Sequence, residues 1–117
     1  METFNDFVKR KKVEIEKKEE ENFSEYLHFL DALSDIEEVV NSNEDTLKGL
    51  ERLKEKAFNQ RNNYRKKIHK YNEDPFGYAQ HSINEVDFWF RSSAKELEKH
   101  NFINEFILKL KQGDDYQ

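Results

Sequence analysis

The pattern of apolar and polar positions along the chain predicts helices and no strand. In its strongest stretch, apolar side chains recur at steps of three and four residues, which places them on one face of a helix. They are Phe23, Tyr26, Leu27, Leu30, Leu33, Ile36 and Val40. Residues 3–22 have a weaker apolar face, and Asn22 followed three positions later by Glu25 is typical of a helix start. We therefore expect residues 3–40 to form one long helix, or two helices that meet near Asn22.

Two further helical segments follow a polar turn at residues 41–45. The first, residues 44–71, has a seven-residue apolar repeat, a pattern that lets one helix pack along another. The repeat consists of Leu50, Ala57, Tyr64 and Tyr71. Proline in the segment Asp74-Pro75-Phe76-Gly77 predicts where this helix ends. The capping-box pair Ser82 and Glu85 predicts the start of the last helical segment.

These elements predict an all-α fold, an elongated bundle of three long helices or of four to five shorter ones, with an antiparallel hairpin. The 117 residues are enough for a single helical domain, residues 1–117. Within it, residues 1–22 are a candidate projecting helical arm, and residues 112–117 a candidate frayed tail. Only three Gly and one Pro, with 38% charged residues, favour long helices with a large solvated surface over a compact globule.

The composition excludes several classes of protein. The chain has no Cys, which rules out disulfides and thiol chemistry. No stretch resembles a signal peptide or approaches the roughly 18 apolar residues of a membrane span, so we expect a cytoplasmic protein. The net charge of −5 disfavours bulk binding to DNA or to an acidic membrane, although a local basic patch is compatible with it.

The charges reverse sign near the middle of the chain. Residues 23–46 contain seven acidic residues and no Lys or Arg, whereas residues 48–70 contain nine basic residues against two acidic ones. If the helices on either side of the turn form an antiparallel hairpin, the acidic residues around Asp31 come to lie beside the basic ones around Lys56. Such exposed pairs contribute only about 0–1 kcal/mol each and would mainly set the register. The pattern therefore predicts either neutralisation within one hairpin or a charged face offered to an outside partner.

Some of the basic residues cannot face the acidic helix, because consecutive positions of a helix point about 100° apart. Those near the end of segment 44–71 form a candidate phosphate-binding stripe, which consists of Arg61, Arg65, Lys66, Lys67 and Lys70. A cationic stripe with Tyr, Asn and Gln nearby suits nucleic acid. A helical nucleic-acid-associated protein is therefore one function that the sequence leaves open.

The most hydrophobic face of the chain lies in its last helical segment. It consists of Phe102, Ile103, Phe106, Ile107 and Leu110. This face either packs in the core or forms the interface with a second copy or a protein partner. Only two basic neighbours, Lys109 and Lys111, argue against a membrane-surface role. Trp89 joins the candidate partner interface, because Phe88, Trp89 and Phe90 cannot all turn to one face of a helix.

Motifs for catalysis, metals and nucleotides are largely missing, and we expect neither an enzyme nor a bound cofactor or metal. Glu25 and His28 have the Glu-x-x-His spacing of di-iron bundles, but the second copy of that pair is missing from the sequence. Arg61, Asn62 and His69 resemble the Arg-polar…His motif of the HEPN-type RNases, which are small all-helical proteins. Seven residues separate Arg61 from His69, a longer spacing than that motif has. The resemblance implies RNA cleavage as a last alternative.

The sequence thus predicts a non-catalytic helical interaction or assembly module, such as an adaptor, a chaperone-like subunit or an inhibitor. It is expected to bind a protein partner or a second copy of itself through the apolar face of the last helical segment. Nucleic acid, bound by the basic stripe, is the alternative partner. No contact with a membrane is expected.

Overall fold

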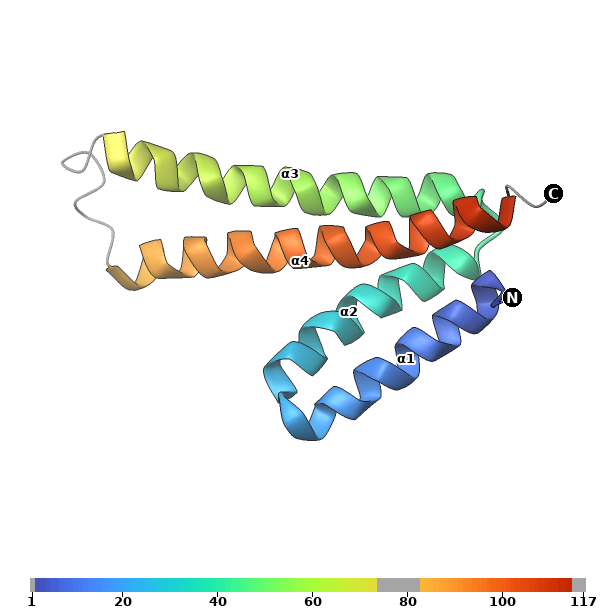
Figure 1. Ribbon diagram of the computed structural model, residues 1–117. Coiled ribbons are helices and arrows are strands. Elements are labelled where there is room, and N and C mark those ends of the chain that lie inside the picture. Colours follow the sequence, from blue (N-terminus) through green and yellow to red (C-terminus); the bar gives the residue numbers. More distant parts are fainter. Residues whose placement is uncertain (1, 74–82, 115–117) are drawn as a thin grey trace.

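The computed structural model describes residues 2–73 and 83–114, and these residues form helices and no strand (Figure 1). The helices are α1 (Phe4–Glu21), α2 (Phe23–Val40), α3 (Thr46–Glu73) and α4 (Ile83–Asp114). The radius of gyration is 17.3 Å, against about 13 Å for a compact domain of this size. The predicted elongated all-α fold is therefore confirmed, with four helices in the described residues.

The first two helices meet at Asn22, which ends α1 and begins α2. Asn22 has an extended backbone (φ −153°, ψ 91°), so the helical path is interrupted there. Its N–H donates to the Lys18 carbonyl oxygen at 2.8 Å, and its side-chain oxygen accepts from the Glu25 N–H at 3.1 Å. These two bonds satisfy backbone groups that a helix end otherwise leaves unpaired. Of the two alternatives for residues 3–40, the structure has two helices.

The four helices form two hairpins that share a core at one end and diverge at the other (Figure 1). α1 and α2 form one hairpin. α3 and α4 form the other, an antiparallel pair with the most extensive helix–helix contact in the described residues. Leu50, Ala57 and Ile68 are buried along α3, on the side that the heptad pattern predicts. The predicted antiparallel hairpin is thus confirmed, but the partner of α3 is α4.

The acidic helix α2 and the basic helix α3 do not neutralise each other along their lengths. Among the described residues, the ion pairs of α2 are with α1 and α4. They are Lys12–Glu37, Lys18–Glu25 and Lys99–Asp35, and His28 Nε2 also lies 3.9 Å from Glu98 Oε2. The predicted pairing of the residues around Asp31 with those around Lys56 is wrong, because α2 turns back on α1 while α3 packs along α4.

The core is centred on the C-terminal half of α4. The fully buried Phe106 ring stands edge-on to the rings of Phe7 and Phe102, with centroids 5.0 and 5.1 Å away. Phe7 and Ile15 place α1 in the same apolar cluster. Residues 4–15 therefore pack against the core instead of projecting from it as an arm, and only the last turns of α1 extend beyond it.

Two of the predicted element ends lie partly or wholly outside the described residues. α4 continues through Gln112 and Gly113 to Asp114, so the predicted frayed tail is helical at its start. Residues 115–117 lie outside the described part of the chain. So do residues 74–82, which hold the predicted Pro75 turn and the Ser82 cap.

Candidate functional site

The part of the α3–α4 hairpin that extends beyond α1 and α2 is called the distal arm (Figure 1). It comprises residues 58–73 and 83–97. Two helices cannot enclose large side chains on every side, and Phe58, Phe88, Phe90 and Leu97 are all exposed. They are four of the eight exposed large apolar side chains in the described residues. Large apolar side chains in water gather at surfaces that bind other molecules.

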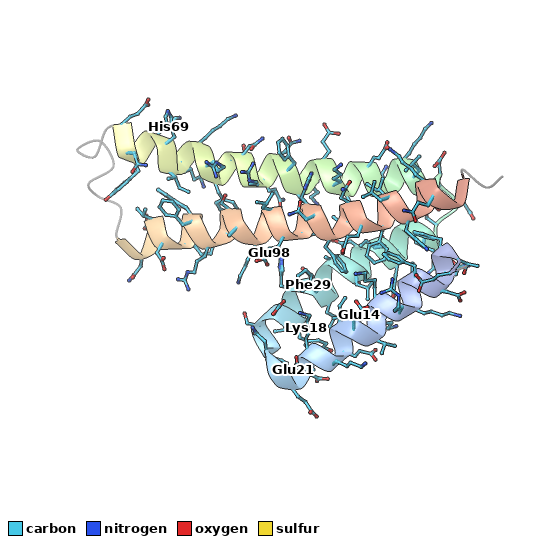
Figure 2. All side chains as sticks on the ribbon, viewed as in Figure 1. Glu14, Lys18, Glu21, Phe29, His69 and Glu98 are labelled. Atoms are coloured by element: carbon cyan, nitrogen blue, oxygen red, sulfur yellow. The ribbon has the colours of Figure 1, made fainter. Side chains whose placement is uncertain are left out.

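A groove of about 400 Å³ runs between α3 and α4 on one face of the distal arm. Its lining residues from α3 are Arg61, Arg65, Ile68, His69 and Asn72. Its lining residues from α4 are Phe90, Ser93, Ala94 and Leu97. Figure 2 shows His69 near the outer end of α3. The groove therefore has a mainly apolar wall on α4 and a largely cationic wall on α3.

The cationic wall follows from helical spacing. Arg61, Arg65 and His69 are four positions apart, so they lie one above another on one face of α3. The Arg61 guanidinium carbon is 5.9 Å from the centroid of the Phe58 ring, within the range of a cation–π contact. Phe58 thus continues the apolar surface next to Arg61.

The predicted phosphate-binding stripe is divided between different sides of α3. Arg61 and Arg65 line the groove. Lys67 instead covers aromatic rings, with its Nζ 5.8 Å from the Tyr64 centroid and 6.0 Å from the Trp89 centroid. The two arginines and Lys67 therefore lie on different sides of α3.

The remaining two residues of that stripe face away from the groove. At 100° per residue, Lys66 and Lys70 point about 140° and 180° away from Arg61. Both side chains are exposed. In the described ranges, none of the five basic residues of the stripe pairs with a carboxylate. Their positive charge on the distal arm is therefore only partly offset by the four acidic residues of the same arm, Glu73, Glu85, Asp87 and Glu96.

The six residues predicted as a partner interface lie in the interior. Trp89, Phe102, Ile103, Phe106 and Ile107 are buried, and Leu110 is half-buried against the core. Core packing, the other interpretation of this face, is what the structure has. The flanking rings of Phe88 and Phe90 are each more than half exposed. The prediction that the three consecutive aromatic residues cannot all be buried together is thus confirmed.

A second groove, of about 370 Å³, lies between the two hairpins. Lys18 Nζ donates to Glu25 Oε1 at 2.8 Å, and Lys11 Nζ is 3.4 Å from Glu105 Oε2. The hydrogen bond to Glu25 raises the pKa of the Lys18 amine above its ordinary value. Figure 2 shows Lys18 and Phe29 on the side of their hairpin that faces this space. Because its lysines already have acidic partners, this groove offers less free charge than the distal arm.

The sequence pairs that suggested metal or RNase chemistry are separated or exposed. Glu25 bonds to Lys18, whereas His28 Nε2 is buried without a hydrogen-bond partner, 3.9 Å from Glu98 of α4. In residues 2–73 and 83–114, no three His, Asp or Glu side chains come together as metal ligands would. His69 lines the groove with Arg61, and its Nε2 is 3.0 Å from Glu73 Oε1.

Sequence reasoning missed the apolar wall of the groove. Phe90, Ala94 and Leu97 follow one another at steps of four and three residues, which is the spacing of one helix face. This spacing predicts an apolar helix face, but it does not show whether another helix of the chain covers that face.

None of the described helices is both long and apolar enough to cross a membrane. Comparison with protein-family models, with curated proteins and with solved structures finds no match to this chain. A proposal about function therefore has to rest on the residues that the fold brings together.

Proposed function

We propose that this chain is a non-catalytic helical interaction module that binds a protein partner through the groove of the distal arm. One observation carries the proposal. Two helices extend beyond the rest of the bundle and expose Phe90 and Leu97 in a groove between them, with Phe58 and Phe88 exposed elsewhere on the same arm. A helix pair left without a third helix is a ready surface for an added helix.

The two walls of the groove indicate what kind of segment would fit. Phe90, Ala94 and Leu97 would pack against the apolar face of an entering helix. Arg61 and Arg65 stand at the edge of the groove, where charges at an interface set orientation and partner choice. Arginine is also among the residues that contribute most to binding energy. The best fit is an amphipathic helix that carries acidic residues along one edge.

The role of such a module is that of an adaptor, a chaperone-like subunit or an inhibitor, acting in the cytoplasm. Each of these roles needs an exposed binding surface and no reacting groups. The groove supplies the surface between two long helices, α3 and α4.

The proposal is tested by site-specific cross-linking, for which a chain without Cys is well suited. A photoreactive group on Ala94→Cys would lie in the groove, whereas one on Lys66→Cys would lie on the opposite side of α3. We expect a protein adduct, to a second copy or to another protein in a cell extract, from position 94 but not from position 66. The double variant Phe90→Ser and Leu97→Ser should remove it. Equal adducts from both positions, or none, would contradict the proposal.

Nucleic acid is the second candidate partner, and one observation favours it. The five basic residues of the predicted stripe have no carboxylate partner in the described chain, and the exposed Lys66 and Lys70 are open to contact phosphate. Changing Lys66, Lys67 and Lys70 to Glu should then greatly weaken binding of RNA or DNA and reduce its salt dependence. A parent protein that binds neither at low salt excludes this function. RNA cleavage that disappears in His69→Ala would instead favour the HEPN-like alternative.

A further inference from the structure

We infer that the groove of the distal arm takes the α1–α2 turn region of a second copy of this chain. This inference rests on the proposed function and names its partner. The turn region, here called the acidic tip, comprises residues 16–31, the end of α1 and the start of α2. Figure 1 shows the tip and the distal arm as the two free ends of a molecule whose hairpins diverge.

The acidic tip has the chemistry that the groove needs. Phe23 is 57% exposed and Leu27 48%, and their spacing of four residues puts both on one side of α2. Six acidic residues and two lysines give the tip a formal charge of −4. Glu19, Glu20 and Glu21 are all exposed, and Figure 2 shows Glu21 at the very end of the hairpin. An apolar pair next to a group of carboxylates is what an apolar wall next to two arginines would recognise.

The distal arm carries the opposite charge. In residues 58–73 five basic residues stand against Glu73 alone, and residues 83–97 contain three acidic and two basic residues. The arm therefore has a formal charge of +3. Opposite formal charges of similar size at the two free ends make the chain complementary to itself.

The fold keeps the acidic tip away from the distal arm of the same chain. α2 leaves α3 at the turn after Val40, and the hairpins diverge from there (Figure 1). The side-chain contacts that join them, Lys11–Glu105, His28–Glu98, Lys99–Asp35 and Lys109–Glu2, lie at residues 98–109 of α4, outside the distal arm. The charge of the tip and that of the arm can therefore be neutralised only by another molecule.

A dimer with a two-fold axis would occupy the acidic tip and the groove of each copy at once. In such a dimer each copy gives its tip to the groove of the other, so Phe23 and Leu27 pack against Phe90 and Leu97 twice. The carboxylates of the tip then face Arg61 and Arg65 of the partner. This arrangement is closed, because no tip or groove stays open for a third copy.

The test is a charge exchange between the two surfaces, with molecular mass measured by light scattering and analytical ultracentrifugation. The tip variant is Glu20→Lys with Glu21→Lys, and the arm variant is Arg61→Glu with Arg65→Glu. We expect the parent chain to be a dimer that dissociates as salt shortens the Debye length from about 10 Å to about 3 Å. Each variant alone should raise the dimer dissociation constant at least about a hundredfold, because like charges then face each other. A mixture of the two should form a one-to-one dimer.

Matched controls separate this contact from a general effect of charge. Glu51→Lys with Glu55→Lys makes the same change in net charge as the tip variant, at exposed positions outside the tip and the groove. It should leave the dimer intact. Circular dichroism should show parent-like helicity in all variants, since the changed side chains are at the surface or only half-buried.

Failure of this inference can be told from failure of the proposed function. A parent chain that is monomeric at high concentration and low salt, or a mixture of variants that does not re-form a dimer, overturns the inference. If Ala94→Cys still cross-links specifically to another protein, the groove is a binding site and only its occupant was wrong. If Ala94→Cys cross-links specifically neither to a second copy nor to another protein, both the inference and the proposed function are wrong.

Discussion

Gly49 packs so closely against Val39 that a Cβ atom on Gly49 would lie 2.5 Å from Val39 Cγ1. This contact joins the end of α2 to the first turns of α3, where the two hairpins meet. Val39 is buried and β-branched, so its side chain has little freedom to rotate away. The absence of a side chain at position 49 therefore sets how closely the two helices approach.

Replacing Gly49 with Ala should destabilise the fold. Alanine favours a helix over glycine by about 1 kcal/mol. Overpacking at a rigid, buried neighbour typically costs about 1–3 kcal/mol, so we expect a lower free energy of unfolding in urea. Gly113→Ala is the control, because nothing lies within 4 Å of the added methyl group. It should be neutral or slightly stabilising, and a stabilising Gly49→Ala would contradict the close contact.

Phe106→Ala should lower the free energy of unfolding by about 3–5 kcal/mol. The side chain is fully buried and contacts the rings of Phe7 and Phe102, so its loss leaves a cavity at the centre of the core. Leu108→Ala, two positions along at an exposed site, should change it by no more than about 0.5 kcal/mol. Chemical denaturation of both variants checks this. Equal effects would place Phe106 outside the core.

Phe106→Asp follows from the same burial. If Phe106 lay at an interface between two copies, as the sequence allows, this variant would be a monomer with full helicity. The structure instead predicts loss of helicity in far-UV circular dichroism, because an unpaired charge cannot be accommodated in an apolar interior. A helical, stable variant would support the interface interpretation.

Asn22→Ala should cost about 1 kcal/mol of stability, because it removes the acceptor for the Glu25 N–H at the start of α2. Asn22→Asp keeps an acceptor at the same place and should retain most of the stability. Thermal unfolding followed by circular dichroism distinguishes the two. If both variants lose the same amount of stability, the side-chain cap does not stabilise the junction between α1 and α2.

The ion pair between Glu2 and Arg10 predicts a pH dependence of stability. Glu2 accepts from Arg10 Nε at 2.7 Å and from Nη2 at 3.1 Å, and this hydrogen bonding lowers the pKa of the Glu2 carboxyl below its ordinary value. A lowered pKa in the folded state stabilises the fold above the unfolded pKa, and this contribution is lost as pH falls through the folded pKa. Arg10 is exposed and Glu2 is partly exposed, so the effect is small.

The measurement is the difference in melting temperature between the parent chain and Glu2→Gln. It should be positive near neutral pH and should shrink toward zero in strong acid. Glu16→Gln, at an exposed carboxylate without an ion pair in the described chain, should show no such trend. A difference that grows on acidification would reverse the sign and contradict the pairing.

Helix positions could be read from the sequence, but helix partners could not. Asn22 with Glu25 marked the break between α1 and α2, and the heptad positions of α3 marked its buried side. Periodicity shows which face of a helix is apolar, and says nothing about which helix covers it. The charge reversal suggested the helices on either side of the turn as partners. Packing decided otherwise, because exposed ion pairs are too weak to choose between arrangements of an apolar core.

The candidate site was anticipated only in part. Arg61 and Arg65 were singled out, and they line the groove with His69. The apolar wall at Phe90 and Leu97 was missed, while the stronger apolar run at residues 102–110 was offered as an interface. Hydrophobic strength alone cannot separate a core face from a binding face, since both need the same side chains.

The sequence by itself determined that the chain is helical, roughly where its helices begin and end, and that residues 23–46 and 48–70 carry opposite charge. Those properties depend on neighbours within a few positions, such as caps, turns and apolar spacing. Only the tertiary structure decided that α3 packs along α4 and that α1 and α2 cover Phe102, Ile103, Phe106 and Ile107, while Phe90 and Leu97 stay beside an open groove. It also decided that the acidic tip and the basic distal arm stay apart, because burial of the apolar faces outweighs the attraction of exposed charges.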